Sequence, residues 1–340
     1  MTICQFLTSN WLVIASLASV LMAGPKALGV IEGIAEATSS VFKLVSGVIV
    51  DRTKKAKPWI LMGYTLAGIG RPLIAIANSW VWVLAIRFTD RLGKGLRSSP
   101  RDALLAESVN ENQRGVTFGL HRSMDNAGAV IGPLLATMFL SMGVPLKDIF
   151  LWAIVPAAIT VMLALCIEEP KREVIPQANK FSWSLEGMPD QFKRYLVVAG
   201  IFALANSSDM FLLLRAREAG VPQEQIPLLW AAISLITTVF GTPLSALSDT
   251  FGRKRFILIA WIAFAFFYIA MGLPGISTHQ IFALFVVYGL FKAATEGVEK
   301  ALVADLAPKG MAGTAFGWFN LISGLMLLPA SLIFGWLYES

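Results

Sequence analysis

Residues that carry catalytic or metal chemistry are scarce in this sequence. The 340 residues include two cysteines, Cys4 and Cys166, and two histidines. So few ligands exclude both a disulfide framework and a zinc cluster. Charged residues make up 15% of the chain, whereas soluble globular chains average about 25%. The sequence contains neither a nucleotide-binding P-loop nor a G-x-S-x-G motif, so we expect no enzyme, no metal and no cofactor.

Apolar residues, in contrast, are abundant. They form 56% of the chain, and the mean hydropathy is +0.67. A membrane-spanning helix needs about 20 mostly apolar residues, and eleven segments meet that requirement. The predicted spans are 3–23, 27–50, 58–78, 79–97, 116–142, 148–167, 195–217, 226–248, 255–274, 279–303 and 313–337. Residues 3–23 lack the basic start of a signal peptide. The fold class that follows is an all-α polytopic membrane protein.

Lysine and arginine are unevenly distributed among the connecting loops. Seventeen lie in one alternating set of loops and four in the other set. The positive-inside rule puts the richer set in the cytoplasm, and this accounts for the net charge of +6 without a nucleic-acid partner. We therefore expect a multi-pass protein of the cytoplasmic (inner) membrane, in contact with the lipid bilayer. Its N-terminus is predicted to be cytoplasmic and its C-terminus external.

The sequence repeats itself at an offset of 198 residues. Between positions 103 and 119, six of the 17 residues are identical to those 198 positions later. Parallel six-span repeats are the architecture of one large transporter class. We expect two such pseudo-repeats, with eleven spans present and the partner of the sixth span missing. The predicted division is a six-helix N-terminal half over 1–167, a charged cytoplasmic linker over 168–194 and a five-helix C-terminal half over 195–340.

Two loops at equivalent positions of the repeat carry related motifs. They read Gly47-Val-Ile-Val-Asp51-Arg52-Thr-Lys54-Lys55 and Ser245-Ala-Leu-Ser-Asp249-Thr-Phe-Gly252-Arg253-Lys254-Arg255. Both resemble the loop signature of the major facilitator superfamily, G-x-x-x-D-x-x-G-R-K/R. Lys54 replaces the second glycine in one copy, and Ser245 replaces the first glycine in the other. The resemblance covers nearly the whole chain, and residues 87–133 look like a branch grouped with bacterial drug and sugar efflux permeases.

In that family the loop is a conformational gate, and the resemblance implies the same role here. A carboxylate at a helix end can accept hydrogen bonds from the backbone where the next helix starts, and glycine lets the two ends approach. We expect Asp51 to matter less than Asp249, because Lys54 breaks the first motif. The alternative is a plain positive loop with a capping aspartate. The predicted gating residues are Gly47, Asp51, Arg52, Lys55, Asp249, Gly252, Arg253 and Lys254.

Ionisable residues within the predicted spans are candidates for a polar cavity, because each costs about 2.5–3.5 kcal/mol to insert. The candidates are Glu32, Glu36, Arg87, Asp90, Arg91, Lys94, Arg122, Asp125, Asp209, Lys292 and Glu296. Glu36 and Asp125 are the predicted proton carriers, although Asp125 and Arg122 could instead form a static pair. Arg91-Leu-Gly-Lys94-Gly95 resembles the family's R-x-x-Q-G motif, which implies a coupling role for Arg91. For Lys43, Arg215, Glu299 and Lys300 we favour snorkelling ends or structural ion pairs.

The fifth predicted span contains Gly128, Gly132, Pro133 and Ala136 at the spacing G-x-x-x-G-P-x-x-A. Small residues four apart allow close helix packing, and proline removes one helical hydrogen bond. The segment resembles the fifth-helix signature of the family's antiporters, which implies proton-driven export. Helix packing without any bearing on transport direction is the alternative.

The sequence leaves three functions open. We favour a monomeric secondary transporter that exports a small molecule in exchange for protons by alternating access. The second is an importer or uniporter of an anionic metabolite, because positive charges outnumber negative ones six to four within the first-half spans. The third is a transport-inactive receptor or scaffold.

Overall fold

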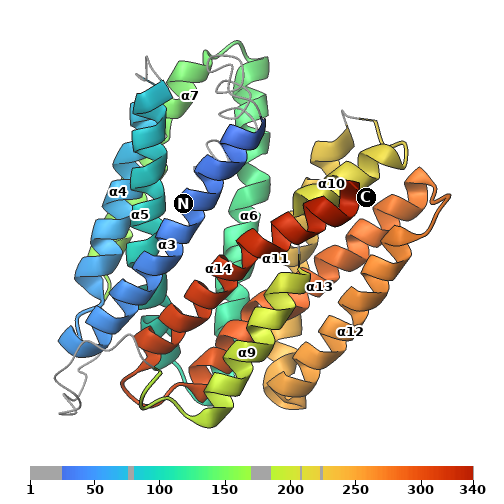
Figure 1. The fold of residues 1–340 in the computed structure, drawn as a ribbon. Helices are drawn as coiled ribbons and strands as arrows, with labels where there is room; N and C mark the ends of the chain where they lie inside the picture. Colours follow the sequence, from blue (N-terminus) through green and yellow to red (C-terminus); the bar gives the residue numbers. More distant parts are fainter. Residues whose placement is uncertain (1–24, 76–79, 170–184, 207–208, 223–224, 340) are drawn as a thin grey trace.

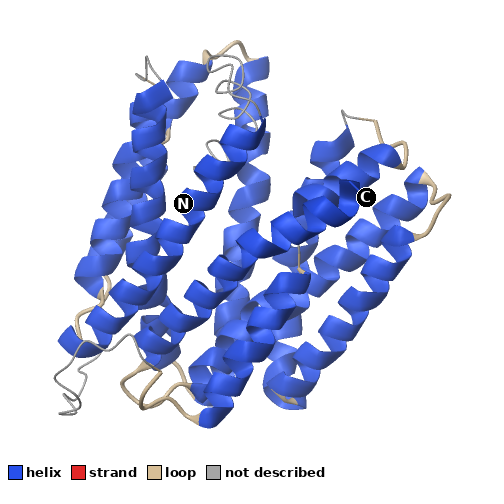
Figure 2. Cartoon of the chain, viewed as in Figure 1, coloured by secondary structure: helices blue, strands red, loops and turns tan. Residues whose placement is uncertain are grey.

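The computed structural model describes residues 25–75, 80–169, 185–206, 209–222 and 225–339. All regular structure in these residues is helical (Figures 1 and 2). The first half contains α3 (Pro25–Thr53), α4 (Lys57–Ile74), α5 (Trp80–Glu107), the 3₁₀ turn η1 (Glu111–Gln113), α6 (Arg114–Ser141), α7 (Leu146–Trp152) and α8 (Ile154–Leu165). The second half contains α9 (Asp190–Ala205), α10 (Asp209–Glu218), α11 (Ile226–Phe251), α12 (Arg253–Gly272), α13 (Thr278–Leu306) and α14 (Ala312–Glu339).

Helices occupy each predicted span from 27–50 to 313–337. The span predicted over 148–167 is divided into α7 and α8, and the span over 195–217 is interrupted between α9 and α10, where the sequence is polar. The first predicted span, 3–23, and most of the predicted linker lie outside the described residues.

The end of α5 differs from its prediction. The sequence ended this span at residue 97, but the helix continues to Glu107 through Pro100. Residues 102–104 of this extension are buried, and Leu104 belongs to an apolar cluster with Val50 of α3 and Ile60 of α4. A segment expected to be a cytoplasmic loop is thus part of the helical core.

The outer surface has the character of a lipid-facing surface. Five described segments are long and apolar enough to cross a membrane. They are Lys147–Leu165, Ile226–Phe251, Arg253–Gly272, Thr278–Leu306 and Ala312–Phe334. On α12, Ile259, Phe266 and Ile269 are each about two-thirds exposed, which a water-soluble surface of that extent rarely tolerates. The protein is an integral membrane protein; the count of eleven spans stays a prediction.

Helices of both halves pack against each other. α3 packs on α14, and α6 packs on α11 and α13. In Figure 1 the helices of the two halves come together at the lower end of the view and diverge toward the upper end. At the lower end, the last residues of α3 lie beside the first residues of α14. The structural connection between the halves is therefore concentrated at one end of the molecule.

Packing differs between the interior of the second half and the seam between the halves. A cluster of aromatic side chains, including Phe264, Phe267, Tyr288 and Phe291, fills the space between α12 and α13. At the seam, a Cβ on Gly119 of α6 would lie 2.5 Å from the Cβ of Ser245 on α11. Small residues of this kind let helix backbones approach closely.

The predicted packing motif of the fifth span lies on α6. Gly128 and Gly132 are both buried, and α6 continues without interruption through Pro133. Ala136, one turn further on, is buried against Ile149 of α7. This arrangement fits a packing role; its relation to the direction of transport stays a prediction.

Candidate functional site

Asp51 caps a helix of the opposite half. It lies past the apolar stretch 27–50, near the end of α3. Its Oδ1 accepts a hydrogen bond from the Gly313 N–H at 2.9 Å, and its Oδ2 accepts one from the Thr314 N–H at 2.6 Å. The first turn of a helix has free N–H groups and a partial positive charge, so it stabilises a carboxylate. We call this contact the first latch.

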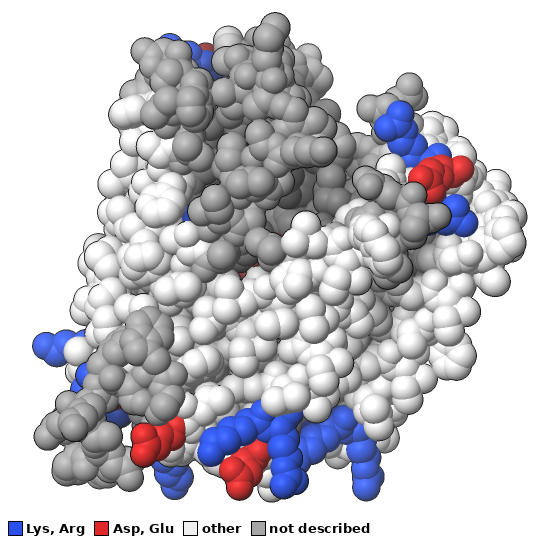
Figure 3. Space-filling model, viewed as in Figure 1, with Lys and Arg blue, Asp and Glu red and all other residues white. Residues whose placement is uncertain are grey.

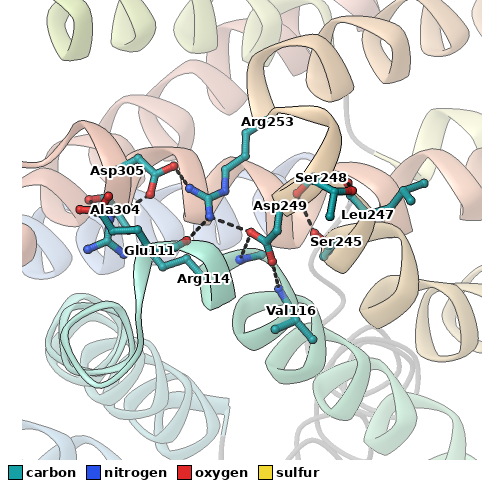
Figure 4. A network of polar contacts seen from close by, with 12 residues as sticks. Glu111, Arg114, Val116, Ser245, Leu247, Ser248, Asp249, Arg253, Ala304 and Asp305 are labelled. Atoms are coloured by element: carbon teal, nitrogen blue, oxygen red, sulfur yellow. Dashed lines mark hydrogen bonds and ion pairs between the residues drawn. The ribbon is translucent and has the colours of Figure 1, made fainter.

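Asp249 makes the equivalent contact from the second half to the first half (Figure 4). Its Oδ1 accepts from the Gly115 N–H at 2.9 Å, and its Oδ2 accepts from the Val116 N–H at 3.0 Å. These groups lie in the first turn of α6, in the other half. We call this contact the second latch. The expectation that each aspartate would cap the next helix along the chain was wrong, because the seam brings the helix starts of the opposite half closer.

The two latches are reciprocal. Positions 51 and 249 differ by 198 residues, as do positions 115 and 313, and positions 116 and 314. When a two-fold axis relates two surfaces, residue i of one contacts residue j of the other and vice versa. The latches follow that pattern within one chain.

Glycine is required where the latches close. A Cβ on Gly115 would lie 2.5 Å from Asp249 Oδ1, and a Cβ on Gly313 would lie 2.8 Å from Asp51 Oδ1. A Cβ on Gly47 would lie 2.7 Å from the Gly313 carbonyl carbon. Sequence reasoning identified Gly47 but assigned no role to Gly115 or Gly313, although the repeat aligns them.

An arginine network reinforces the second latch (Figure 4). Arg253 Nη2 donates to Asp249 Oδ1 at 2.7 Å and to the Glu111 carbonyl at 2.6 Å, and Arg253 Nη1 pairs with Asp305. Asp305 also pairs with Arg114 Nη1 at 2.9 Å. Arg114 and Asp305 were missed as site residues. The signal that could have found Asp305 is its repeat equivalent, Glu107, which is also acidic.

Lys54 does not break the first motif, contrary to the expectation from sequence. It has a φ of 56°, and its repeat equivalent, Gly252, has a φ of 92°. Lys54 therefore keeps the positive φ that the glycine of the signature adopts, and this conformation has a steric cost for a residue with a Cβ. The Lys54 Nζ also donates to the Gly310 carbonyl at 3.1 Å, across the seam. Among the other predicted gating residues, Arg52, Lys55 and Lys254 are exposed.

Replacing Lys54 tests the strain at this position. Lys54→Gly and Lys54→Ala both lose the bond to Gly310, but only glycine adopts this φ without strain. We expect Lys54→Gly to be the more stable of the two by about 0.5–1 kcal/mol, after the greater chain entropy of glycine is deducted. Thermal unfolding in detergent, followed by tryptophan fluorescence, measures the difference. Equal stabilities would mean that residue 54 relaxes out of the left-handed region.

Predicted cavity residues form ion pairs within α6 and within α13. Asp125 Oδ2 lies 3.9 Å from Arg122 Nη1 and 3.9 Å from His121 Nδ1 on α6. On α13, Lys292 Nζ lies 3.8 Å from Glu296 Oε1. The spacing-based pairs Arg122/Asp125 and Lys292/Glu296 are thus present.

The two groups are connected across the seam. Asn126 on α6 donates to Glu296 Oε2 at 3.5 Å, a contact that the sequence did not predict. The Lys292 ammonium also lies 5.5 Å from the Trp230 ring centroid and 5.8 Å from that of Tyr288. The i, i+4 spacing allowed Lys300 to pair with Glu296, but Lys300 pairs with Asp102 of α5 instead.

The remaining predicted cavity residues are less fully defined. Asp90, Arg91 and Lys94 are partly buried on α5. The predicted opposition of Arg91 and Asp125 stays a prediction. For four residues the helix is described but the side chain is not: Glu32 and Glu36 on α3, Arg87 on α5 and Asp209 on α10.

An all-helical chain with a lipid-facing surface and reciprocal contacts between two halves has the architecture of a membrane transporter. The family model of the Major Facilitator Superfamily matches residues 1–331. The chain belongs to that superfamily, and it is a membrane transporter rather than an enzyme.

Relatives of the chain support this assignment. An uncharacterised MFS-type transporter of Methanocaldococcus jannaschii is 31% identical over 326 residues, which cover 93% of this chain and 80% of the relative. The multidrug resistance protein MdtH of Proteus mirabilis is 29% identical over 289 residues, which cover 82% of this chain and 69% of MdtH.

Solved structures share the fold. The human organic anion transporter MFSD10 superimposes with a TM-score of 0.80 at 15% identity, over 95% of this chain and 82% of that chain. A bacterial homologue of the iron transporter ferroportin, in an outward-facing state, has a TM-score of 0.67 at 17% identity, over 100% of this chain and 89% of that chain.

Proposed function

We propose that the protein is a secondary active transporter that exports a small molecule across the cytoplasmic membrane in exchange for protons, by alternating access. The observation that carries the proposal is the pair of reciprocal latches. They join the halves at one end of the molecule, while the helices diverge toward the other end (Figure 1). Two bodies connected at one end can rock, and this exposes a central site to each side in turn.

The latch end is the cytoplasmic end in this proposal. Lysine and arginine side chains gather along that lower edge, with smaller groups at the upper left and upper right (Figure 3). The positive-inside rule assigns the richer side to the cytoplasm. The N-terminus is then cytoplasmic, and residues 1–167 and 195–340 form two pseudo-symmetric halves joined by the linker 168–194. The conformation described here faces outward. We expect the protein to work as a monomer.

Coupling to protons rests on Glu36, Asp125 and Arg91. Asp125 lies between His121 and Arg122 on α6, the helix that packs across the seam. A carboxylate among such groups can release and regain a proton as its surroundings change with the cycle. We rank Glu36 slightly above Asp125 as the proton carrier, with Arg91 as the charge that responds to its state.

The experiment compares Glu36→Gln and Asp125→Asn in proteoliposomes with an imposed pH gradient. A variant that removes the proton carrier should lose proton-driven flux, by about tenfold or more, yet retain substrate exchange. The matched control is Asp190→Asn, whose side chain is 83% exposed. Full pH-dependent flux in both variants would show that these carboxylates are structural.

Export is the proposed direction because of the similarity to MdtH, a multidrug resistance protein, and because of the antiporter-like segment Gly128–Pro133. A panel of drug-like and anionic compounds in the same vesicles tests the substrate class. Counterflow without proton movement would favour the uniporter, and absence of flux for every compound would favour the scaffold.

A further inference from the structure

A buried ion pair lies between the halves, on α5 and α13. Lys300 Nζ on α13 binds Asp102 Oδ2 on α5, and the side chains are 5% and 0% exposed. Arg101 Nη2 lies 3.2 Å from the other oxygen, Asp102 Oδ1. A buried charge that loses its partner is strongly unfavourable, so this pair holds the two helices together only while both charges are present.

The pair lies on the axis that relates the halves. Positions 102 and 300 differ by 198 residues, so they are equivalents in the repeat and contact each other. The same holds for Phe118 and Phe316, whose ring centroids are 5.6 Å apart. On a two-fold axis a residue meets its own equivalent. Two independent contacts of this kind therefore mark the axis of the seam.

The sequence is charge-inverted at this point of the repeat. The first half carries Arg101-Asp102, and the second half carries Glu299-Lys300 at the equivalent positions. The residues that follow are the same in both halves: Ala103-Leu104 matches Ala301-Leu302, and all four are buried. Identical residues at 102 and 300 would put like charges in contact. Opposite charges turn a position of repulsion into one of attraction.

We infer that the Asp102–Lys300 pair is a third cytoplasmic lock, placed on the pseudo-two-fold axis, which must break each time the cytoplasmic side opens. This inference rests on the proposed alternating access. Because α5 and α13 belong to opposite halves, their separation parts the two charges. Water that enters the opened seam then solvates both, so opening exchanges the ion pair for hydration. The pair positions the halves and takes no part in binding the substrate.

The test measures the separation of the cytoplasmic ends by double electron–electron resonance. Spin labels are attached to Ser108→Cys and Lys309→Cys, exposed positions on opposite halves, in a Cys4→Ser/Cys166→Ser background. The variants are Asp102→Lys, the neutral pair Asp102→Asn/Lys300→Met and the reversed pair Asp102→Lys/Lys300→Asp. The control is Asp190→Asn, which removes an exposed charge pair within one helix.

We expect Asp102→Lys to raise the ratio of long to short distances at least tenfold. The reversed pair restores the attraction between positions 102 and 300 but places a lysine beside Arg101, so we expect it to lower the ratio again by about threefold or more relative to Asp102→Lys. The neutral pair removes both of the deeply buried charges, and the Arg101 side chain that loses Asp102 is 18% exposed. It therefore keeps the test valid if Asp102→Lys fails to fold, and we expect it to raise the ratio at least threefold.

Two results would overturn the inference. One is a distance distribution in Asp102→Asn/Lys300→Met that equals that of the labelled protein without these substitutions. The other is a ratio of long to short distances in the reversed pair as high as that in Asp102→Lys. The proposed function fails in a different way. If the parent keeps one short distance at every pH and substrate condition while it transports, the halves do not alternate, whatever the variants do.

Discussion

Asp249→Asn should open the latch end of the molecule more than any other single change at the latches. The asparagine keeps one acceptor oxygen but points an amide donor at a backbone N–H, and it loses the charge that holds Arg253 at 2.7 Å. Hydrogen bonds to a charged group contribute about 1.5–3 kcal/mol each. A loss of about 2–3 kcal/mol raises the open-to-closed ratio roughly 30- to 150-fold, since each 1.4 kcal/mol is a factor of ten. The Ser108/Lys309 label pair measures the ratio.

Asp51→Asn should have a smaller effect, for a reason that differs from the one that the sequence suggested. Lost hydration at the seam raises the pKa of the Asp51 carboxyl to about 6, despite the hydrogen bonds from Gly313 and Thr314. Holding this group ionised at neutral pH therefore has a cost, and Asn removes that cost together with the charge. We expect an increase of about three- to tenfold. An equal or larger effect than that of Asp249→Asn would contradict this view of the two latches.

Gly47→Ala should separate α3 from α14. The added Cβ would meet the carbonyl group of Gly313, and backbone atoms of two packed helices cannot move aside as a flexible side chain can. Overpacking costs about 1–3 kcal/mol in well-packed interiors. We expect the purified variant to unfold several degrees lower and to populate the long distance between the labels.

Ser245→Ala is the matched substitution at the equivalent position. Ser245 already has a Cβ, and its hydroxyl is buried without a hydrogen-bond partner among the described residues. Its removal should leave stability unchanged or slightly higher. A second control is Gly272→Ala, because a Cβ there would meet no atom within 4 Å. If Gly47→Ala behaves like these two controls, close approach at Gly47 is not what the first latch needs.

Patterns within single segments predicted much of this protein. Runs of about 20 apolar residues predicted the helices from α3 to α14, and the spacing within helices predicted the Arg122/Asp125 and Lys292/Glu296 pairs. Contacts between distant segments were not accessible in this way. The donors to Asp51 are 262 and 263 residues away along the chain, and no local spacing encodes them.

The repeat could have supplied some of those contacts. Asp51 and Asp249 are equivalent in the repeat, and so are the residues that they contact. A contact of one aspartate with the opposite half therefore predicts the equivalent contact of the other aspartate. The extension of α5 was missed because Arg101 and Asp102 resemble loop residues. The Asp102 carboxylate is buried because Lys300 of the other half and the neighbouring Arg101 neutralise it, and hydropathy along one segment contains no information about a partner in another.

The difference in packing between the second half and the seam determines which parts of the molecule can move as units. Interlocked rings such as Phe264, Phe267 and Tyr288 have to change rotamers together before α12 and α13 can slide past each other. At the seam, Gly119 and Ser245 bring α6 and α11 together through backbone and short side chains, and Phe118 and Phe316 are large side chains that meet there. The second half is therefore expected to move as a rigid body, and relative motion is expected at the seam between the halves. Rotation between the halves requires breaking the polar contacts and separating the Phe118 and Phe316 rings, while the ring cluster inside the second half stays packed.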